Sequence, residues 1–180
     1  MYYNILMITA HDYKYCPSCG SNEFAKKEKY LYICPNCDLH FYINPKPTNA
    51  IILRNNKGEI LFAVRKHDPF KGKWDLAGGF VDPKETLEES VIREVKEELS
   101  IDITDFKYVS SFHETYEHGG INSETICFVF EGIIPEGANI IPSDDAESVT
   151  FFKPADIPYE DMAFEGMKKV VKDYADTLKI

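Results

Sequence analysis

"GFVDPKETLEESVIREVKEELSI", residues 79–101, is the stretch that decides the fold of this chain. A glycine-bearing loop leads into a segment whose apolar residues recur every three or four positions, which predicts an amphipathic helix. Thr86 and Glu89 make a capping-box pattern, so we predict that the helix begins near Leu87. Three glutamates, at positions 94, 97 and 98, lie close together on this helix. Like charges at that spacing repel one another, so their face is either well solvated or binds a cation.

The glutamates border the apolar face of the predicted helix. At about 100° per residue, the apolar side chains fall on one arc: Leu87, Val91, Ile92, Val95 and Leu99. Glu94, Glu97 and Glu98 occupy the adjoining arc, with Glu98 at its apolar margin. An ion-pair ladder through Glu89 and Arg93 would account for Glu97. It leaves the other two glutamates at the edge of the core, where a carboxylate needs a partner. A hard divalent cation with oxygen ligands would supply one.

The spacing of the fixed residues resembles the Nudix box, G-x5-E-x7-R-E-U-x-E-E-x-G-U, in which U is a bulky aliphatic residue. The matching residues are Gly79, Glu85, Arg93, Glu94, Val95, Glu97, Glu98 and Ile101. Ser100 is the one departure, because it stands where the box has its second glycine. So many residue types at fixed spacing make a chance match very improbable. On these residues the chain is identified as a member of the Nudix family, over about residues 45–180.

This resemblance implies an α+β fold in which an α/β/α sandwich is built around a mixed sheet. It also implies that the loop–helix–loop binds Mg²⁺ or Mn²⁺ and that the chain is a metal-dependent pyrophosphohydrolase. Such enzymes hydrolyse a nucleoside diphosphate linked to another moiety and release a nucleoside monophosphate. Bound metal ions would neutralise the pyrophosphate, activate water and stabilise the leaving phosphate.

The family's site positions transfer to this sequence residue by residue. The glutamates at metal-ligand positions are Glu94, Glu97 and Glu98. The Gly79 carbonyl is at a position that often supplies a further ligand, while Arg93 and Glu85 would orient the ligands through hydrogen bonds. Ser100 touches no matched ligand, but glycine takes a left-handed conformation at a helix end more readily than serine does. The exit from the helix is therefore where a departure from the family pattern is expected.

The box does not say which residue is the general base. Three acidic residues precede a predicted strand near the C-terminal end, at a place where some Nudix enzymes keep another carboxylate: Asp144, Asp145 and Glu147. One of them could supply such an additional carboxylate.

Four of the five cysteines occur as two C-x-x-C pairs: Cys16, Cys19, Cys34 and Cys37. Each pair can present two thiolates to one ion, and two pairs complete a tetrahedral zinc site. We predict a zinc ribbon over residues 16–44, with iron or a redox pair as alternatives. A segment this short cannot bury a core of its own, so a metal ion would supply its folding energy. Residues 1–15 are a tyrosine-rich leader without an assignable role, and residues 45–180 form the Nudix domain.

A zinc ribbon followed by a Nudix domain resembles NADH pyrophosphatases and related enzymes that act on ADP-ribose or FAD. The signature SQPWPFPxS, typical of NADH-specific members, is not present after the box. The corresponding region reads "SSFHETYEHGGINSE", residues 110–124. This argues against NADH as the sole substrate. Phe112 and Tyr116 in this region are candidates for stacking on the substrate, although each could instead pack in the core.

The rest of the chain mixes strands and helices without strict alternation, which favours an α+β arrangement. Strand-like segments occupy residues 48–54, 59–66, 106–116, 124–134 and 148–153. In the final segment, helical spacing places apolar residues on one face: Phe164, Met167, Val170, Val171, Tyr174 and Leu178. This face is predicted to pack on the core.

Two features of the sequence are also compatible with other classes of function. A Nudix-derived sensor would bind a nucleotide without cutting it, but this box keeps all its carboxylates, which favours an enzyme. Lys26, Lys27 and Lys29 in the ribbon could contact nucleic acid or a protein partner. The formal net charge of −10 argues against a surface that coats nucleic acid. No signal peptide or spanning segment is recognisable, so a cytoplasmic location is predicted. The expected partner is a small nucleotide, and a homodimer is left open.

Overall fold

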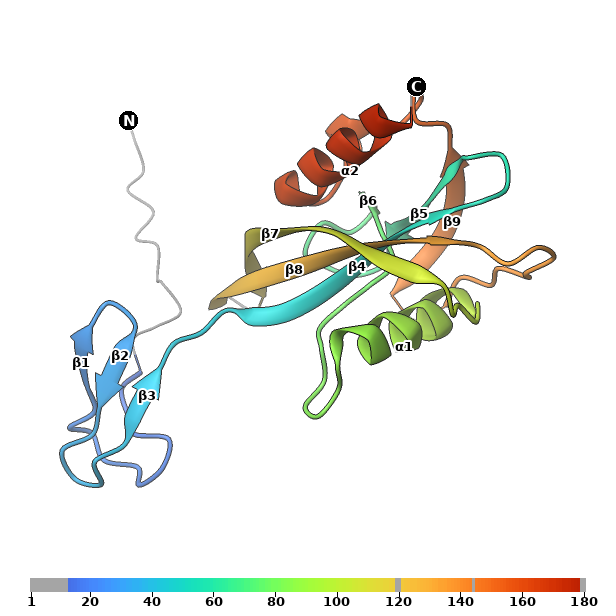
Figure 1. Cartoon of the computed structure of the whole chain (residues 1–180). Helices are drawn as coiled ribbons and strands as arrows, with labels where there is room; N and C mark the ends of the chain where they lie inside the picture. The colour runs from blue at the N-terminus through green and yellow to red at the C-terminus, as the bar shows by residue number, and fades with distance from the viewer. Residues whose placement is uncertain (1–12, 119–120, 144, 179–180) are drawn as a thin grey trace, which may run out of the picture. The chain divides into compact units, whose positions relative to one another are not determined.

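The computed structural model describes residues 13–118, 121–143 and 145–178 of the 180-residue chain (Figure 1). The chain divides into two compact units. The first contains residues 1–45 and 115–124, and the second contains residues 46–114 and 125–180. Each unit is built around its own sheet.

A six-stranded sheet lies at the centre of the second unit, in the order β6-β5-β4-β8-β7, with β9 paired to β5. The strands are β4 (Lys46–Arg54), β5 (Ile60–Arg65), β6 (Trp74–Asp75), β7 (Phe106–His118), β8 (Ile121–Ile133) and β9 (Ala146–Phe152). β4 runs parallel to β8, with Lys46 opposite Thr125 and Arg54 opposite Ile133. β5 is antiparallel to β4, β6 and β9. The sheet is therefore mixed, as predicted.

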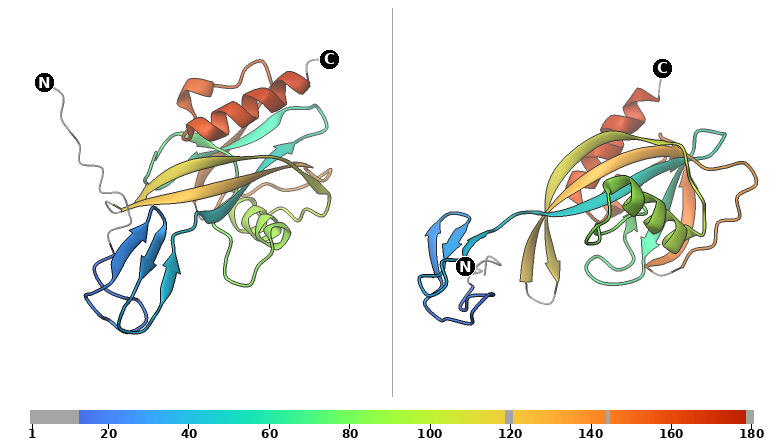
Figure 2. Two further views of the ribbon diagram at one scale, coloured as in Figure 1. Left: turned by 60° about the vertical axis from the view of Figure 1, so that its left-hand side comes forward. Right: turned by 60° about the horizontal axis from the view of Figure 1, so that its bottom comes forward.

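Helices cover both faces of this sheet, α1 (Leu87–Leu99) on one side and α2 (Glu165–Thr177) on the other (Figures 1 and 2). A short 3₁₀ helix, η1 (Tyr159–Asp161), precedes α2. The alternation of side chains along β4 explains the two layers. Ala50 and Ile52 pack in the core on the α2 side, and Ile51 and Leu53 pack in the core on the α1 side. A strand covered on both faces is a continuous apolar run, so the predicted α/β/α sandwich is confirmed.

The helices confirm most of the predicted apolar faces. Four of the six residues predicted on the C-terminal helix are buried: Met167, Val170, Val171 and Tyr174. Phe164 precedes α2 as its N-cap and is partly buried against the same core. One expectation for α1 was wrong, because Ile92 is 41% exposed. The part of α1 that packs on the sheet is narrower than the predicted arc and is centred on Val91, Val95 and Leu99.

The chain after β6 lies against β4 and carries the start of the box. The N–H groups of Ile51 and Asn49 donate to the carbonyls of Ala77 and Gly79, each at 2.9 Å. Gly78 has a φ of +147°, and a Cβ there would lie 2.2 Å from the Asn49 carbonyl oxygen. Only glycine allows this close approach, so Gly78 fixes the loop against the sheet.

The first unit contains an antiparallel sheet of β1 (Ala25–Glu28), β2 (Leu31–Ile33) and β3 (His40–Tyr42). A small core lies beneath it, formed by Cys16, Phe24, Tyr32 and Cys34. Tyr13 packs edge-on against three rings of this unit, with centroid distances of 6.4, 5.6 and 5.1 Å to Phe24, Tyr32 and Phe41. Part of the predicted leader therefore belongs to the aromatic packing of the ribbon; residues 1–12 lie outside the described residues.

Within the described part of the chain, neither α-helix has the length and apolar character needed to cross a membrane.

Candidate active site

The capping box predicted at the start of α1 is present. The Thr86 hydroxyl oxygen accepts the N–H of Glu89 at 3.2 Å, and the Glu89 carboxylate accepts the N–H of Thr86 at 2.8 Å. Two N–H groups that the helix itself cannot pair are thereby satisfied. Glu88 and Glu89 also place negative charge at the positive end of the helix dipole. These contacts fix where the carboxylate-bearing face of α1 begins.

Ser100 ends α1 in the left-handed conformation that a glycine would adopt. Its φ and ψ are 58° and 25°, and its N–H donates to the Lys96 carbonyl at 3.0 Å. The exit from the helix thus follows the glycine geometry despite the substitution. A non-glycine residue in this conformation carries a strain that a glycine would avoid.

The segment before β9 closes the C-terminal end of α1. The N–H of Ser143 donates to the Glu98 carbonyl at 2.9 Å, and its hydroxyl donates to the Glu97 carbonyl. These contacts satisfy carbonyls that the last turn leaves open. They also bring Asp145, two residues further on, to the carboxylate side of α1.

Arg93 links the loop and helix carboxylates. Its Nε and Nη2 donate to the two carboxylate oxygens of Glu85, at 2.7 and 3.0 Å. Its Nη1 donates to Glu94 at 2.8 Å and to Glu97 at 3.0 Å. Nη2 also donates to the Phe80 carbonyl at 3.0 Å. The hydrogen bonds from Arg93 lower the pKa of Glu85 to about 2, so this carboxylate stays ionised.

Glu98 is the most buried of the box glutamates, with 7% of its surface exposed. The N–H of Gly78 donates to it at 3.3 Å. Burial, together with the negative charges of Glu94, Asp75 and Asp145, raises the pKa of Glu98 to about 9. Burial likewise raises the pKa of Glu94, against the opposing effect of its arginine partner. A cation bound beside them would oppose this increase and favour the charged form of both carboxylates.

A hollow of about 40 Å³ lies beside Glu98 and is lined in part by Arg65, Asp75 and Asp145. Asp75 is buried and accepts a hydrogen bond from Arg65 Nη1 at 2.8 Å. Asp145 is more exposed, and His67 Nε2 lies 3.8 Å from its carboxylate. The hollow therefore collects three carboxylates and one guanidinium next to the box helix.

Of the two described members of the predicted acidic group, Asp145 lines this hollow. Glu147 is exposed on β9. Asp144 lies outside the described residues. The use of Asp145 as an additional carboxylate of the site remains a prediction.

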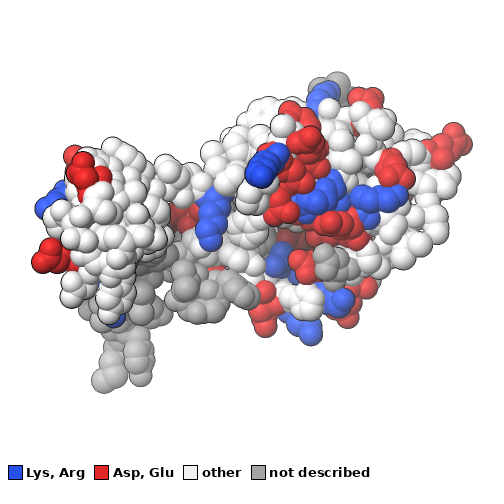
Figure 3. Space-filling model, turned by 90° about the horizontal axis from the view of Figure 1, so that it is seen from below, with Lys and Arg blue, Asp and Glu red and all other residues white. Residues whose placement is uncertain are grey.

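The donor chemistry of the box fits a hard divalent cation. Among the described residues, no lysine or arginine forms an ion pair with Glu98, although other carboxylates surround it. Oxygen ligands are those that Mg²⁺ and Mn²⁺ prefer. The Gly79 carbonyl accepts one N–H, from Asn49, and so keeps one lone pair for a cation. On the face of the second unit that carries α1, Figure 3 shows acidic and basic side chains interleaved.

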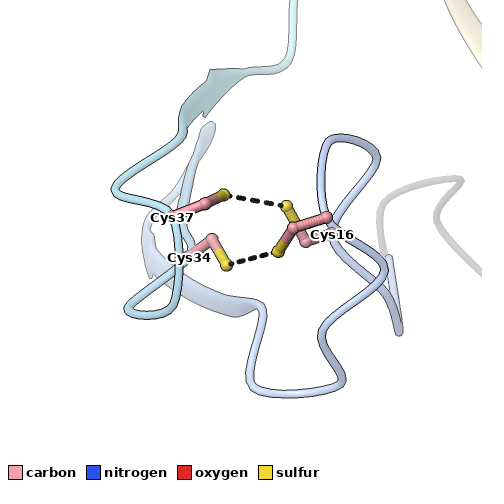
Figure 4. Close-up of side chains that lie close together, drawn as sticks. Cys16, Cys34 and Cys37 are labelled. Atoms are coloured by element: carbon pink, nitrogen blue, oxygen red, sulfur yellow. Dashed lines mark hydrogen bonds between the residues drawn. The ribbon is translucent and has the colours of Figure 1, made fainter.

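The four predicted ribbon cysteines meet in space. The sulfurs of Cys16 and Cys37, and those of Cys19 and Cys34, are 3.6 Å apart (Figure 4). All four sulfurs lie within 4.8 Å of one another, and all four are free thiols. Tetrahedral zinc with bonds of about 2.3 Å would separate its sulfurs by about 3.8 Å, so the cluster fits the ion. Within the described ranges, no other group of three or more Cys, His, Asp or Glu is as tightly gathered.

One ribbon thiol is also prepared to lose its proton. The backbone of Ser21 and the side-chain amide of Asn36 donate toward Cys19 and lower its pKa to about 6. The Asn36 amide nitrogen lies 3.6 Å from the sulfur. A thiolate is the form that binds metal, so these donors favour coordination.

Comparison with known proteins agrees with the box. The family model of the NUDIX domain matches residues 44–174. This chain belongs to the Nudix hydrolase family. The crystal structure of a NUDIX hydrolase from Nitrosomonas europaea superposes with a TM-score of 0.67 at 26% identity, covering 91% of each chain.

Two kinds of curated Nudix relative are similar to this chain. An ADP-ribose pyrophosphatase of Methanocaldococcus jannaschii is 36% identical over 136 residues, which is 74% of this chain and 75% of the relative. An NAD-capped RNA hydrolase, NudC, of Pseudomonas aeruginosa is 26% identical over 154 residues, which is 84% of this chain. The match spans 51% of that NudC, so this chain covers about half the length of such relatives.

The two candidate substrate-stacking residues lie in different surroundings. Phe112 is half-buried against the core on the α2 side. A Cβ on Gly166 of α2 would lie 2.2 Å from its ring, so the ring is packed directly on that helix. Tyr116 belongs to the segment 115–124, which groups with the first unit. Their contact with a Nudix substrate remains a prediction.

Sequence reasoning missed the buried pair of Asp75 and Arg65. The signal was available, because a lone aspartate in the apolar run "WDLA" (74–77) has to find a buried partner. Its partner could not be read from the sequence, since Arg65 lies on a different strand. Ser143 was also missed, and no motif in the sequence marks it.

Proposed function

We propose that this Nudix protein hydrolyses the pyrophosphate of a nucleoside diphosphate linked to another moiety, of the ADP-ribose, FAD or NADH type, and releases a nucleoside monophosphate. The observation that carries the proposal is the buried Glu98 carboxylate. It lies near Glu94, which is also on α1, and near Asp145 from the segment before β9. The charged form of a buried carboxylate that lies near other carboxylates is unfavourable without a bound cation. A cation there could hold the phosphate oxygens of a substrate.

In this proposal Glu94, Glu97 and Glu98 bind Mg²⁺ or Mn²⁺, with the Gly79 carbonyl as a further ligand. The metal, when bound, would neutralise the diphosphate and lower the pKa of a coordinated water. Arg93 and Glu85 orient the glutamates rather than contact the substrate. Because Arg93 donates to both Glu94 and Glu97, it fixes the direction in which each presents its second oxygen.

The remaining steps of the proposal concern the proton and the substrate's position. Asp145 is exposed enough to exchange a proton with water and lies beside Glu98, so it is our candidate for the general base. Arg65 presents a guanidinium, fixed by Asp75, at the same hollow. A fixed guanidinium can balance charge on a nearby phosphate without reorganising.

The cysteines of the ribbon, residues 16–44, would hold Zn²⁺ in a structural role, separate from the hydrolase domain at residues 45–180. Closed four-cysteine sites leave no open position for a substrate. The ribbon would therefore contribute folding energy and not chemistry.

The substrate class is supported by similarity alone. The relative with 36% identity is an ADP-ribose pyrophosphatase, which places ADP-ribose first among the candidates. The NudC relatives add NAD-capped RNA as a further compound to test. The metals would bind the diphosphate that all these compounds share, so discrimination has to come from other contacts.

A hydrolysis screen with Mg²⁺ or Mn²⁺ tests this proposal. It should include ADP-ribose, FAD, NADH, NAD-capped RNA, dinucleoside polyphosphates and nucleoside triphosphates, with products separated by chromatography. We expect a nucleoside monophosphate from ADP-ribose or FAD at a kcat/KM at least equal to that for NADH. Efficient hydrolysis of nucleoside triphosphates, with ADP-ribose, FAD and NADH all left intact, would refute the substrate class. Tight binding of ADP-ribose without any turnover would instead support a nucleotide sensor.

A further inference from the structure

Asn49 and Ser90 form a buried polar pair directly beneath the start of the box. Asn49 is 3% exposed on β4, and Ser90 is 0% exposed on α1. The Asn49 side-chain amide donates to the Ser90 hydroxyl oxygen at 2.7 Å. The backbone N–H of Asn49 donates to the Gly79 carbonyl at 2.9 Å. One residue of the sheet therefore contacts both the glycine loop and the helix that follows it.

Ser90 also forms hydrogen bonds with residues next to the box carboxylates. Its oxygen accepts hydrogen bonds from Asn49 and, at 3.3 Å, from Arg93 Nη2. Its own hydrogen points to the Phe80 carbonyl at 3.5 Å. A hydroxyl has one hydrogen and two lone pairs, so all of its hydrogen-bonding capacity is used. The Phe80 carbonyl also accepts from Arg93, which closes a ring of contacts between loop and helix.

The stability of the fold alone does not account for an asparagine at position 49. Its carbonyl oxygen, Oδ1, is buried and has no hydrogen-bond partner among the described residues. A buried polar atom without a partner destabilises the folded state, and an apolar residue of similar size would avoid this. Gly78 lies against β4 at the same position, and a Cβ on Gly78 would be 2.2 Å from the backbone carbonyl oxygen of Asn49. The glycine loop therefore has no room to shift toward β4, and the Asn49–Ser90 pair fixes the position of α1 relative to it.

We propose that Asn49 and Ser90 are positioning residues that set the affinity of the box for its divalent metal. They would do so through their side-chain contact, which fixes α1 and the Arg93 guanidinium relative to β4. The backbone N–H at position 49 holds the Gly79 carbonyl on β4 in the natural chain and in either variant. This inference rests on the proposed function, because it assumes that the box glutamates bind the metal. Neither residue is defined by the box pattern, in which position 90 is free and position 49 lies outside.

The test is a titration of the full-length, zinc-loaded protein with Mn²⁺, followed by the loss of the free-Mn²⁺ electron paramagnetic resonance signal. No nucleotide is present, so the readout is metal binding and not turnover. We expect Ser90→Ala and Asn49→Ala each to raise the Kd of the box site by about 10-fold or more. The Kd of the double variant should not exceed that of the weaker-binding single variant, because the two residues act through one contact.

Two further variants keep the result interpretable. Thr125→Val removes another buried hydroxyl, which donates to the Glu114 carbonyl at 3.0 Å, and should leave the Kd unchanged even if the Tm falls. Ser90→Ala is a favourable change for helix propensity, so it should fold even if Asn49→Ala does not. Glu97→Gln reports on the metal site itself.

Each outcome has one meaning. If Glu97→Gln binds Mn²⁺ as tightly as the natural chain, the proposed metal site is wrong. If Glu97→Gln weakens binding but folded Ser90→Ala leaves it unchanged, the metal site stands and the positioning role is overturned. If the double variant's increase in Kd equals the product of the single increases, the two residues act independently and the proposed pair is also overturned.

Discussion

The guanidinium of Arg93 and the carboxylate of Glu85 meet through two parallel hydrogen bonds, with Nε–Oε1 at 2.7 Å and Nη2–Oε2 at 3.0 Å. The two residues are eight positions apart, one in the loop and one in the second turn of α1. The pair therefore fixes the loop to the helix, and the remaining Nη1 is left to bind Glu94 and Glu97. A planar, two-pronged donor is required to make all of these contacts at once.

Arg93→Lys should retain the charge and lose most of these contacts, since an ammonium cannot reproduce the guanidinium's fork. We expect kcat/KM to fall by about 10- to 100-fold, as for other residues that orient metal ligands. Steady-state kinetics at saturating Mg²⁺ measures this. Lys96→Ala is the matched control, because Lys96 pairs with Asp102 outside the carboxylate group and should not matter. Equal kcat/KM for Arg93→Lys and the natural chain would contradict the orienting role.

Replacing Glu97 or Glu98 by Gln should abolish most turnover while the protein still folds. Each change removes a proposed ligand charge at nearly constant shape. Glu98→Gln should also raise the Tm of Mg²⁺-free protein, because burial makes the charged form of this carboxylate unfavourable. Kinetics and thermal unfolding report the two effects separately. Glu88→Gln changes an exposed glutamate on the same helix and serves as the control. Near-normal turnover of both variants at saturating Mg²⁺ would show that neither is a ligand.

The chain should hold two metals with different exchange behaviour. Four thiolates hold Zn²⁺ tightly, whereas carboxylates release Mg²⁺ or Mn²⁺ readily. Elemental analysis after gel filtration should give about one zinc per chain. A brief EDTA treatment should stop hydrolysis before zinc is lost, and added Mg²⁺ should restore it. A folded ribbon by NMR in protein that contains no zinc would disprove the zinc assignment.

Tyr116→Ala should change the preference among substrates more than the rate on any one of them. If the ring contacts the group beyond the diphosphate, its loss alters the ratios of kcat/KM among ADP-ribose, FAD and NADH. Tyr108→Ala is the control, because Tyr108 is an exposed tyrosine elsewhere on β7 and packs edge-on against Phe130. Unchanged ratios in Tyr116→Ala would remove this residue from the substrate site.

Ser100→Gly should stabilise the protein. Serine at a φ of 58° carries a left-handed strain of about 1–2 kcal/mol that glycine avoids. The greater conformational freedom of glycine in the unfolded chain opposes this gain by about 0.5–1 kcal/mol. The net increase in unfolding free energy is therefore about 0.5–1 kcal/mol. Urea unfolding of the natural chain and the variant measures it. Ser100→Ala keeps the strain and should give no increase; a destabilised Ser100→Gly would mean that the serine side chain contributes more than its strain removes.

The sequence by itself determined the family, the fold class and the local structure of the box. Short-range physics explains why. The capping box at Thr86 and Glu89, the helical spacing of Val91, Val95 and Leu99 and the C-x-x-C pairs are all patterns within a few residues. The left-handed end of α1 was not predicted, because the serine led us to expect a departure there, yet Ser100 adopts the conformation of a glycine.

Only the tertiary structure decided how deeply each carboxylate is buried and what stands beside it. Glu97 and Glu98 are neighbours in sequence, yet Glu97 is exposed and Glu98 is buried, with 7% of its surface exposed. The difference arises because the loop at Gly78, held against β4, covers only one side of the helix. Asp75, Asp145 and Asn49 come from three separate strands or loops, and no local pattern connects them to α1. Their proximity depends on strand pairing across the sheet, which a single sequence does not specify. Burial by this packing raises the pKa of Glu98, and the charges of Asp75 and Asp145 add to the increase.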